Sequence, residues 1–325
     1  MKRVFLGIDT SNYTTSCALA DESGKVLVNL KMPLSVAEGE RGLRQSDAVF
    51  QHTHAVPELI GRLKEEIASA GDGLNICAVG FSSSPRDVEG SYMPCFLVGE
   101  AIARSIAFGA DAPVYSFSHQ SGHLMAALYS ADALSLIDGE FAAFHVSGGT
   151  TEAVFVSPDP DRIFSVEKIG GTLDLSAGQL IDRIGVKMGF PFPCGKYVDE
   201  CACGYSGEKD AVRVKVNDMY CNISGAENQA MGIYEKYNDK GRTCAFVLEF
   251  ISRTLLKISG QIRERRPDIP ILYAGGVMSS LYIKERLKVM NGYHASPEYS
   301  SDNAAGVALL AREKHRRITR DEQPV

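Results

Sequence analysis

The sequence predicts an α/β protein of two related lobes, and three observations lead to this fold class. Short apolar runs typical of strands alternate with longer stretches typical of helices. Each half of the chain opens with a strand, a polar turn and a second strand, which we interpret as a degenerate internal repeat. The chain has 325 residues and 45% hydrophobic content, so it is long enough to bury a sizeable core and to form two lobes.

The first half begins with a predicted hairpin. Its strands cover Val4 to Ile8 and Cys17 to Ala20, its turn covers residues 10–15, and a third strand covers Lys25 to Lys31. We then expect a helix over 46–70, a strand over 76–81, a helix from Pro94 to about Phe108 and a strand over 114–117. We expect the first lobe to end near Ala112, which gives an N-terminal lobe of residues 1–112 and a C-terminal lobe of residues 113–325. The last helix could pack back on the N-terminal lobe.

The second half repeats the pattern with a strand over 141–146, a turn over 147–151 and a strand over 152–156. Hydroxyl and glycine turns suit phosphate, because small residues let backbone N–H groups approach its oxygens. A single turn of this kind is also an ordinary polar hairpin turn, but two of them favour a nucleotide held between lobes. Gly275-Gly276, after a strand over 271–274, suits an adenosine platform and is also common turn punctuation.

Two histidines follow the predicted strand over 114–117. His119 and His123 are four residues apart, which places both imidazoles on one face of a helix. That spacing is typical of metal ligands, although such pairs also arise in structural or surface roles. The sequence therefore indicates a candidate metal site that needs a further ligand.

Composition limits the classes of partner. Lys and Arg total 34 and Asp and Glu total 40, a net charge of -6, so a polyanion partner must use a local basic patch. No apolar stretch approaches the roughly 20 residues of a membrane span. The apolar run near Met1 ends at Asp9 and is shorter than we expect of a signal peptide. The eight cysteines are expected to be reduced thiols of a cytoplasmic protein. The spacing of Cys194, Cys201 and Cys203 matches no standard zinc pattern.

Taken together, the three turns resemble those of the actin, sugar-kinase and Hsp70-like superfamily. That resemblance implies an actin-like ATPase (ribonuclease H-like) fold, with the ligand in the cleft between two lobes. Within it, the chain resembles the tRNA N6-adenosine threonylcarbamoyltransferase family, formerly the glycoprotein endopeptidase family. The matching motifs, in the family's order, are Gly7 to Ser11 with Thr15-Ser16, Gly90-Ser91 with Val98-Gly99, His119 and His123 with Gly122, His145 to Gly149, Asp174 to Arg183, Pro193-Cys194-Gly195, and Ser301 to Ala305.

The resemblance implies a metal site with two histidines and one carboxylate. His119, His123 and Asp302 would ligate one divalent ion, iron or zinc, and leave open positions for a ligand. This set is chemically sensible, since a Lewis acid can polarise a carbonyl group under attack. Without the resemblance, Asp302 would equally suit the N-cap of the last helix.

The resemblance also implies a site for an adenylate substrate or ATP. The implied substrate-binding residues are His145, Val146, Ser147, Gly148, Gly149, Asp182, Gly195, Asp199 and Ser280. Residues 147–149 would hold the phosphate, while Asp182, Gly195 and Asp199 would contact the nucleoside, since carboxylates commonly accept ribose hydroxyls. Without the resemblance, we would interpret Asp182 as a solvated helix residue paired with Arg183 or Lys187.

Several positions depart from the family pattern. A charged loop from Ser83 to Glu89 replaces a small Gly-Pro-Gly loop, and Tyr13-Thr14 replaces two carboxylates. Thr150 replaces a histidine, and Ser280 replaces an asparagine. Residues 223–228 differ from the family's Phe-Ser-Gly-Leu-Lys-Thr. The metal and nucleotide framework therefore looks kept, while the substrate-facing shell looks altered.

The leading hypothesis is an acyltransferase of the threonylcarbamoyladenine synthase type. It would transfer a threonylcarbamoyl group from threonylcarbamoyl-AMP to the N6 amine of an adenosine next to the tRNA anticodon, with metal dependence and with other subunits of a complex. The alternatives are a paralogue acting as a carbamoyl-type transferase or kinase on another acceptor, and a non-catalytic nucleotide-binding partner. A peptidase is not favoured, since no His-Glu-x-x-His helix is present.

Two basic groups are candidates for contact with tRNA. They are Arg263, Arg265 and Arg266 in one, and Arg312, Lys314, Arg316, Arg317 and Arg320 in the other. The alternative is structural, because basic residues are common in the last turns of helices.

Overall fold

The computed structural model describes residues 1–325 except 12, 37–42, 70–72, 301, 303 and 322–325. Ser301 and Asn303 of the last motif, and Asn12 of the first turn, therefore lie outside the described residues. The chain forms two compact units. The first unit contains residues 1–137, 158–165 and 301–325, and the second contains residues 138–157 and 166–300.

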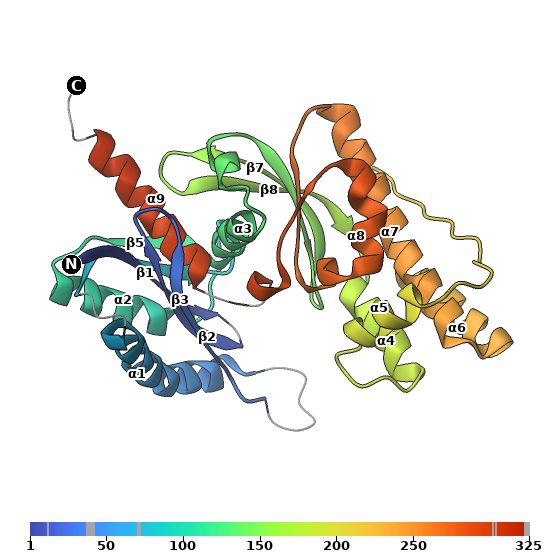
Figure 1. The fold of residues 1–325 in the computed structure, drawn as a ribbon, viewed down its shortest axis with the longest axis horizontal. Helices are drawn as coiled ribbons and strands as arrows, with labels where there is room; N and C mark the ends of the chain where they lie inside the picture. The colour runs from blue at the N-terminus through green and yellow to red at the C-terminus, as the bar shows by residue number, and fades with distance from the viewer. Residues whose placement is uncertain (12, 37–42, 70–72, 301, 303, 322–325) are drawn as a thin grey trace. The chain divides into compact units, whose positions relative to one another are not determined.

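The first unit is built on a five-stranded sheet with the order β3-β2-β1-β4-β5. Its strands are β1 (Lys2–Ser11), β2 (Thr14–Asp21), β3 (Val26–Pro33), β4 (Leu74–Ser84) and β5 (Val114–Ser118). The β1–β2 and β2–β3 pairs are antiparallel, whereas β4 runs parallel to β1, and β5 runs parallel to β4. Figure 1 shows this sheet between α1 (Gln45–Ser69) and α2 (Phe96–Ala110) on one side and α9 (Ala305–Asp321) on the other.

Alternation along β1 decides what packs on each face of this sheet. Leu6 and Ile8 join a core with Leu59 of α1 and Ala103 of α2. Gly7 points the other way, where a Cβ atom would lie 2.4 Å from the Ala304 carbonyl oxygen. The sequence therefore uses glycine where α9 lies against the strand.

Glycine also lets α9 approach α3 (His119–Ser130). A Cβ atom on Gly306 would lie 1.8 Å from the carbonyl oxygen of Gly122, a distance that no side chain tolerates. The first unit consequently includes both helices and extends to Ile137, beyond the predicted boundary at residue 112. The physical reason is that β5 pairs with β4 and α3 packs on α9, so a break at 112 would divide one sheet and one core.

The second unit is built on a six-stranded sheet with the order β11-β10-β6-β7-β8-β9. Its strands are β6 (Phe141–Val146), β7 (Thr151–Asp159), β8 (Ile163–Thr172), β9 (Tyr220–Cys221), β10 (Ile271–Ala274) and β11 (Tyr293–His294). The β6–β7 pair is antiparallel, β10 runs parallel to β6, and β11 runs parallel to β10. Apart from the short β9, the order β8-β7-β6-β10-β11 repeats that of the first sheet, in agreement with the predicted internal repeat.

Helices of the second unit surround a core that is centred on α7, a helix of 26 residues. The helices are α4 (Ala177–Lys187), α5 (Gly195–Cys203), α6 (Ser224–Tyr237), α7 (Lys240–Arg265) and α8 (Leu281–Leu287). Short 3-10 turns are η1 (Leu134–Asp138), η2 (Gly276–Ser279), η3 (Lys288–Met290) and η4 (Pro297–Tyr299). Among the described helices, none has the length and apolar character needed to cross a membrane.

The turn predicted over residues 10–15 is wrong in its extent. β1 continues to Ser11 and β2 starts at Thr14, so most of the predicted turn is strand. The hydroxyl of Thr10 is buried, donates to the carbonyl oxygen of Cys95 at 2.9 Å and accepts from the N–H of Gly99 at 3.1 Å. Its polar side chain therefore links the sheet to the start of α2. In the sequence alone, such a polar residue is hard to distinguish from a turn residue.

We predict that Gly306→Ala strongly destabilises the first unit. Its methyl group would overlap the backbone of α3, and overpacking of this kind costs about 1–3 kcal/mol or more. Gly260→Ala on α7 is the matched control, because a Cβ atom at Gly260 meets no heavy atom within 4 Å. Replacing glycine in an open helical site should stabilise by about 0.4–1 kcal/mol. Urea unfolding measures both, and a Gly306→Ala protein as stable as the wild type would contradict the close packing.

Candidate functional site

Three potential metal ligands meet in the first unit. His119 is the first residue of α3, His123 lies one turn later, and Asp302 precedes α9. The Nε2 atom of His123 lies 2.9 Å from Nε2 of His119 and 3.2 Å from Oδ1 of Asp302. One ligand atom from each residue can be chosen so that all lie within 4.8 Å of one another. The four-residue spacing and the close approach of α9 together produce this convergence.

Asp9 fixes the orientation of His119. Oδ2 of Asp9 lies 2.9 Å from Nδ1 of His119 and 3.1 Å from the hydroxyl of Ser11, which donates to it. Because a carboxylate accepts, Nδ1 of His119 is the donor and its Nε2 atom faces His123 and Asp302. Asp9 is fully buried at the end of β1, so its side chain is held in place by the sheet.

The centre is arranged around positive charge. Burial opposes charge on His119, but the Asp9 and Asp302 carboxylates outweigh it and raise the pKa of His119 to about 10. Burial likewise opposes charge on Asp302, yet hydrogen bonds from His119 and His123 hold the pKa of Asp302 well below its usual range. The imidazole nitrogens of His119 and His123 and the carboxylate of Asp302 would also suit a divalent cation.

The charged loop before α2 is held against the start of α3. Oδ2 of Asp87 accepts from the hydroxyls of Ser118 at 2.6 Å and Ser121 at 3.1 Å. The N–H of Gln120 donates to the carbonyl oxygen of Pro85 at 3.1 Å. The sequence suggested that this loop alters the substrate-facing shell, but Asp87 is directed at the helix that carries His119.

A cavity of about 580 Å³ lies in the second unit. Of the predicted substrate-binding residues, it is lined by Gly148, Asp182, Gly195, Asp199 and Ser280. His145, Val146, Ser147 and Gly149 are not among its lining residues, and Val146 is fully buried in β6. Lys196 and Glu200 also line the cavity, although the sequence analysis missed them.

The two predicted nucleoside-binding carboxylates differ in their free hydrogen-bonding capacity. Asp199 accepts from the N–H of Leu281 at 2.9 Å, from the N–H of Tyr282 at 3.2 Å and from the hydroxyl of Ser280. It therefore holds the start of α8. Oδ1 of Asp182 accepts from the N–H of Cys194 at 2.8 Å, and its Oδ2 has no partner among the described residues. Asp182 is consequently the stronger candidate for a ribose hydroxyl.

The glycine loop after β6 is folded against the start of α4. The N–H of Gly178 donates to the carbonyl oxygen of Ser147 at 3.2 Å, and the hydroxyl of Ser176 donates to that of Gly148 at 2.7 Å. Ser176 and Gln179 also form a capping box that starts α4. This Ser-x-x-Gln pattern is a signal in the sequence that could have located the start of the helix. Gly148 and Gly149 stay exposed, with room for a ligand.

Several basic side chains proposed for tRNA contact are used within their own unit. Arg265 pairs with Asp218, Arg266 pairs with Glu140 at 2.6 Å, and Arg263 donates to the carbonyl oxygen of Met290. On α9, Arg316 and Arg317 pair with the buried Glu313, Lys314 donates to the carbonyl oxygen of Pro160, and Arg312 donates to that of Glu22. These contacts favour the structural interpretation of both basic groups.

A family model described as tRNA N6-adenosine threonylcarbamoyltransferase matches residues 38–309. The protein of that name from Methanopyrus kandleri is 25% identical over 330 residues, which cover 99% of this chain and 91% of that protein. The Streptococcus suis protein of that name is 26% identical over 340 residues, which cover 95% of this chain and 96% of that protein.

Solved structures extend the likeness to the fold. Full-length HypF in its phosphate- and nucleotide-bound form has a TM-score of 0.59 and 12% identity, covering 98% of this chain and 46% of that chain. Component A of (R)-2-hydroxyglutaryl-CoA dehydratase from Acidaminococcus fermentans has a TM-score of 0.53 and 12% identity, covering 96% and 99%. At this identity the likeness concerns the fold alone, and the predicted actin-like ATPase fold is confirmed.

We predict that His52 makes the first unit sensitive to acid. His52 on α1 is fully buried beside Thr15, and burial lowers its pKa to about 4, although the charge of Asp9 partly opposes this shift. The unfolded chain protonates near pH 6.5, so the stability contribution is present above that pH and is lost as pH falls toward 4.

His52→Asn should remove up to about 3 kcal/mol of the stability difference between pH 7.5 and pH 4.5, measured by urea unfolding. His54→Asn, at an exposed position of the same helix, is the control. An unchanged pH dependence in His52→Asn would contradict the assignment.

Proposed function

Because the chain belongs to the tRNA N6-adenosine threonylcarbamoyltransferase family, we propose that it transfers a threonylcarbamoyl group from threonylcarbamoyl-AMP to the N6 amine of an adenosine next to the tRNA anticodon. A bond forms between N6 and the carbamoyl carbon, the bond from that carbon to the phosphate oxygen breaks, N6 loses a proton, and AMP leaves. The observation that carries this proposal is the convergence of His119, His123 and Asp302.

The donor set fits a divalent metal such as iron or zinc. Two imidazole nitrogens and a carboxylate oxygen converge, and a carboxylate orients one imidazole from behind. A metal bound there would act as a Lewis acid toward the carbonyl group or phosphate of the donor. Asp9, for its part, keeps Nε2 of His119 directed at the ligand position.

In this proposal, the cavity of the second unit would hold the adenylate. The cavity lined by Gly148, Asp182 and Gly195 combines exposed backbone with a carboxylate oxygen that has no described partner. Asp182 would accept from a ribose hydroxyl, and the glycine backbone would approach the phosphate closely. An adenosine amine is a weak nucleophile, so the chain's main tasks are to orient both substrates and to favour departure of AMP.

We predict that Asp9→Asn lowers the affinity for zinc or iron about 10- to 100-fold, as expected when the partner of a ligating histidine is lost. Titration calorimetry on the purified chain measures the affinity directly and requires no turnover. Asp21→Asn is the control, since Asp21 is a buried carboxylate at the other end of the β1–β2 pair, where it forms an ion pair with Lys2 at 3.2 Å. Equal metal affinity in wild type and Asp9→Asn would argue against the orienting role.

The transfer itself is tested in cells that lack their own enzyme and receive this chain with the family's partner proteins. We expect mass spectrometry to detect restored threonylcarbamoyladenosine in tRNA with the wild type, and none with His119→Ala. His54→Ala, an exposed histidine far from the ligand set in sequence, should restore it. No restoration by a folded, metal-loaded wild type would exclude tRNA as the acceptor and favour a paralogue that acts on another molecule.

A further inference from the structure

An extended segment of the second unit lies outside the catalytic elements described above. Residues 211–216 belong to no helix or strand, yet their burial alternates with a period of two. Val212 and Val216 are buried in the core, whereas Arg213 and Lys215 are exposed. The segment therefore presents a row of cations to solvent while its valines hold it in place.

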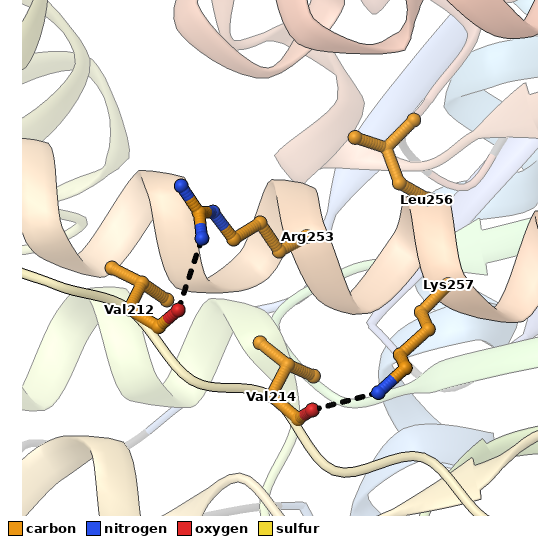
Figure 2. A pocket seen from close by; sticks show the side chains of 5 residues that line it. All are labelled: Val212, Val214, Arg253, Leu256 and Lys257. Carbon is orange, nitrogen blue, oxygen red and sulfur yellow. Dashed lines mark hydrogen bonds between the residues drawn. The ribbon is translucent and has the colours of Figure 1, made fainter.

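Two cations of α7 fasten this segment from the side, as Figure 2 shows. Arg253 donates to the carbonyl oxygen of Val212 at 3.0 Å, and Lys257 donates to that of Val214 at 3.0 Å. The four residues from Arg253 to Lys257 advance about 6 Å along the helix, and the two residues from Val212 to Val214 advance about 6.6 Å, so the two spacings match. These residues and Leu256 line a groove of about 440 Å³. The exposed cations thus stand on a fixed support.

We define the basic strip as Arg213, Lys215 and Lys257. None of the three has an acidic partner among the residues that the structure describes. Four other cations of this unit are paired with an acid: Arg242 with Asp210, Arg265 with Asp218, Arg286 with Glu249 and Lys288 with Glu285. Arg253 is likewise paired with Glu249 at 2.7 Å. The strip is a local excess of positive charge on a chain with a net charge of -6.

We propose that the basic strip binds the phosphate backbone of the tRNA substrate, an inference that rests on the proposed function. A lysine ammonium has three donors, and Lys257 uses one of them on a carbonyl oxygen, which leaves two for phosphate oxygens. Arg213 and Lys215 point outward about 6.6 Å apart and can contact successive acceptors. Such contacts position an RNA without reading its sequence.

RNA is favoured over an added peptide strand by the side chains that face outward. A peptide that pairs with an extended edge takes specificity from pockets for alternate side chains. Here the exposed side chains include the cations of Arg213 and Lys215, and Leu256 is the apolar residue among the groove side chains that α7 supplies. The strip therefore suits a regular series of negative charges.

The test measures tRNA binding without metal or adenylate, so that it does not depend on transfer. Unmodified tRNA is titrated with the full chain at several salt concentrations, and fluorescence anisotropy reports the Kd. The double variant Arg213→Gln/Lys215→Gln should bind at least about tenfold more weakly, and the slope of log K against log salt should fall by about two. Lys257→Gln alone should lower the slope by about one.

The control variant is Arg265→Gln/Lys288→Gln, which also removes two exposed charges from the second unit, but both of these are paired. It should bind tRNA like the wild type. Because Arg213 and Lys215 are exposed, the double variant should keep the wild-type Tm and AMP affinity. In multiple-turnover assays of tRNA modification, its KM for tRNA should rise.

Three results would overturn the inference. They are an unchanged Kd in the double variant, a weaker Kd with an unchanged salt slope, and equal weakening in the control. Tighter binding of an acidic peptide than of tRNA, lost in the double variant, would assign the strip to a protein partner instead. If the wild type binds tRNA through the strip but modifies no adenosine, the proposed function fails while this inference stands. If the wild type modifies tRNA and the strip variants do so equally well, the proposed function stands while this inference fails.

Discussion

The candidate metal centre depends on the close approach of α9 to β1 and α3. Gly7 and Gly306 lack the side chains that would hold the helix away, and Gly122 offers its backbone at the crossing. That contact brings Asp302 beside two histidines more than 170 residues earlier in the chain. A bulkier residue at any of these contacts would move one ligand relative to the others, so the geometry of the site is set by backbone packing.

Two carboxylates of the first unit, Asp9 and Asp87, also hold α3 in place. Asp9 lies behind His119, and Asp87 binds the hydroxyls at the start of the same helix. Each carboxylate satisfies donors that would otherwise be buried without partners, and each restricts α3 in a different way. The helix that bears both imidazoles is thus positioned from the strand end, from the preceding loop and from α9.

The sequence could predict features whose cause is local. The alternation of strands and helices, the repeat and the pairing of His119 with His123 follow from spacing, and the structure places these two side chains together. Asp302 was assigned only through a family resemblance, because nothing near it in sequence indicates the fold that brings it close. Asp9 and Asp87 act across 110 and 31 residues, respectively, and their partners cannot be inferred from pattern. The boundary at residue 112 was misplaced for the same reason, since α3 packs on a helix from the other end of the chain.

The repeated strand order relates the two segments that carry the ligand set. α3 follows β5, the last strand of the first repeat, and α9 follows β11, the last strand of the second. The histidines and the aspartate thus come from the segments that follow the last strand of each repeat. Each repeat carries only part of the ligand set, so neither forms the set by itself. A substitution in one repeat can therefore change one type of ligand and leave the other in place.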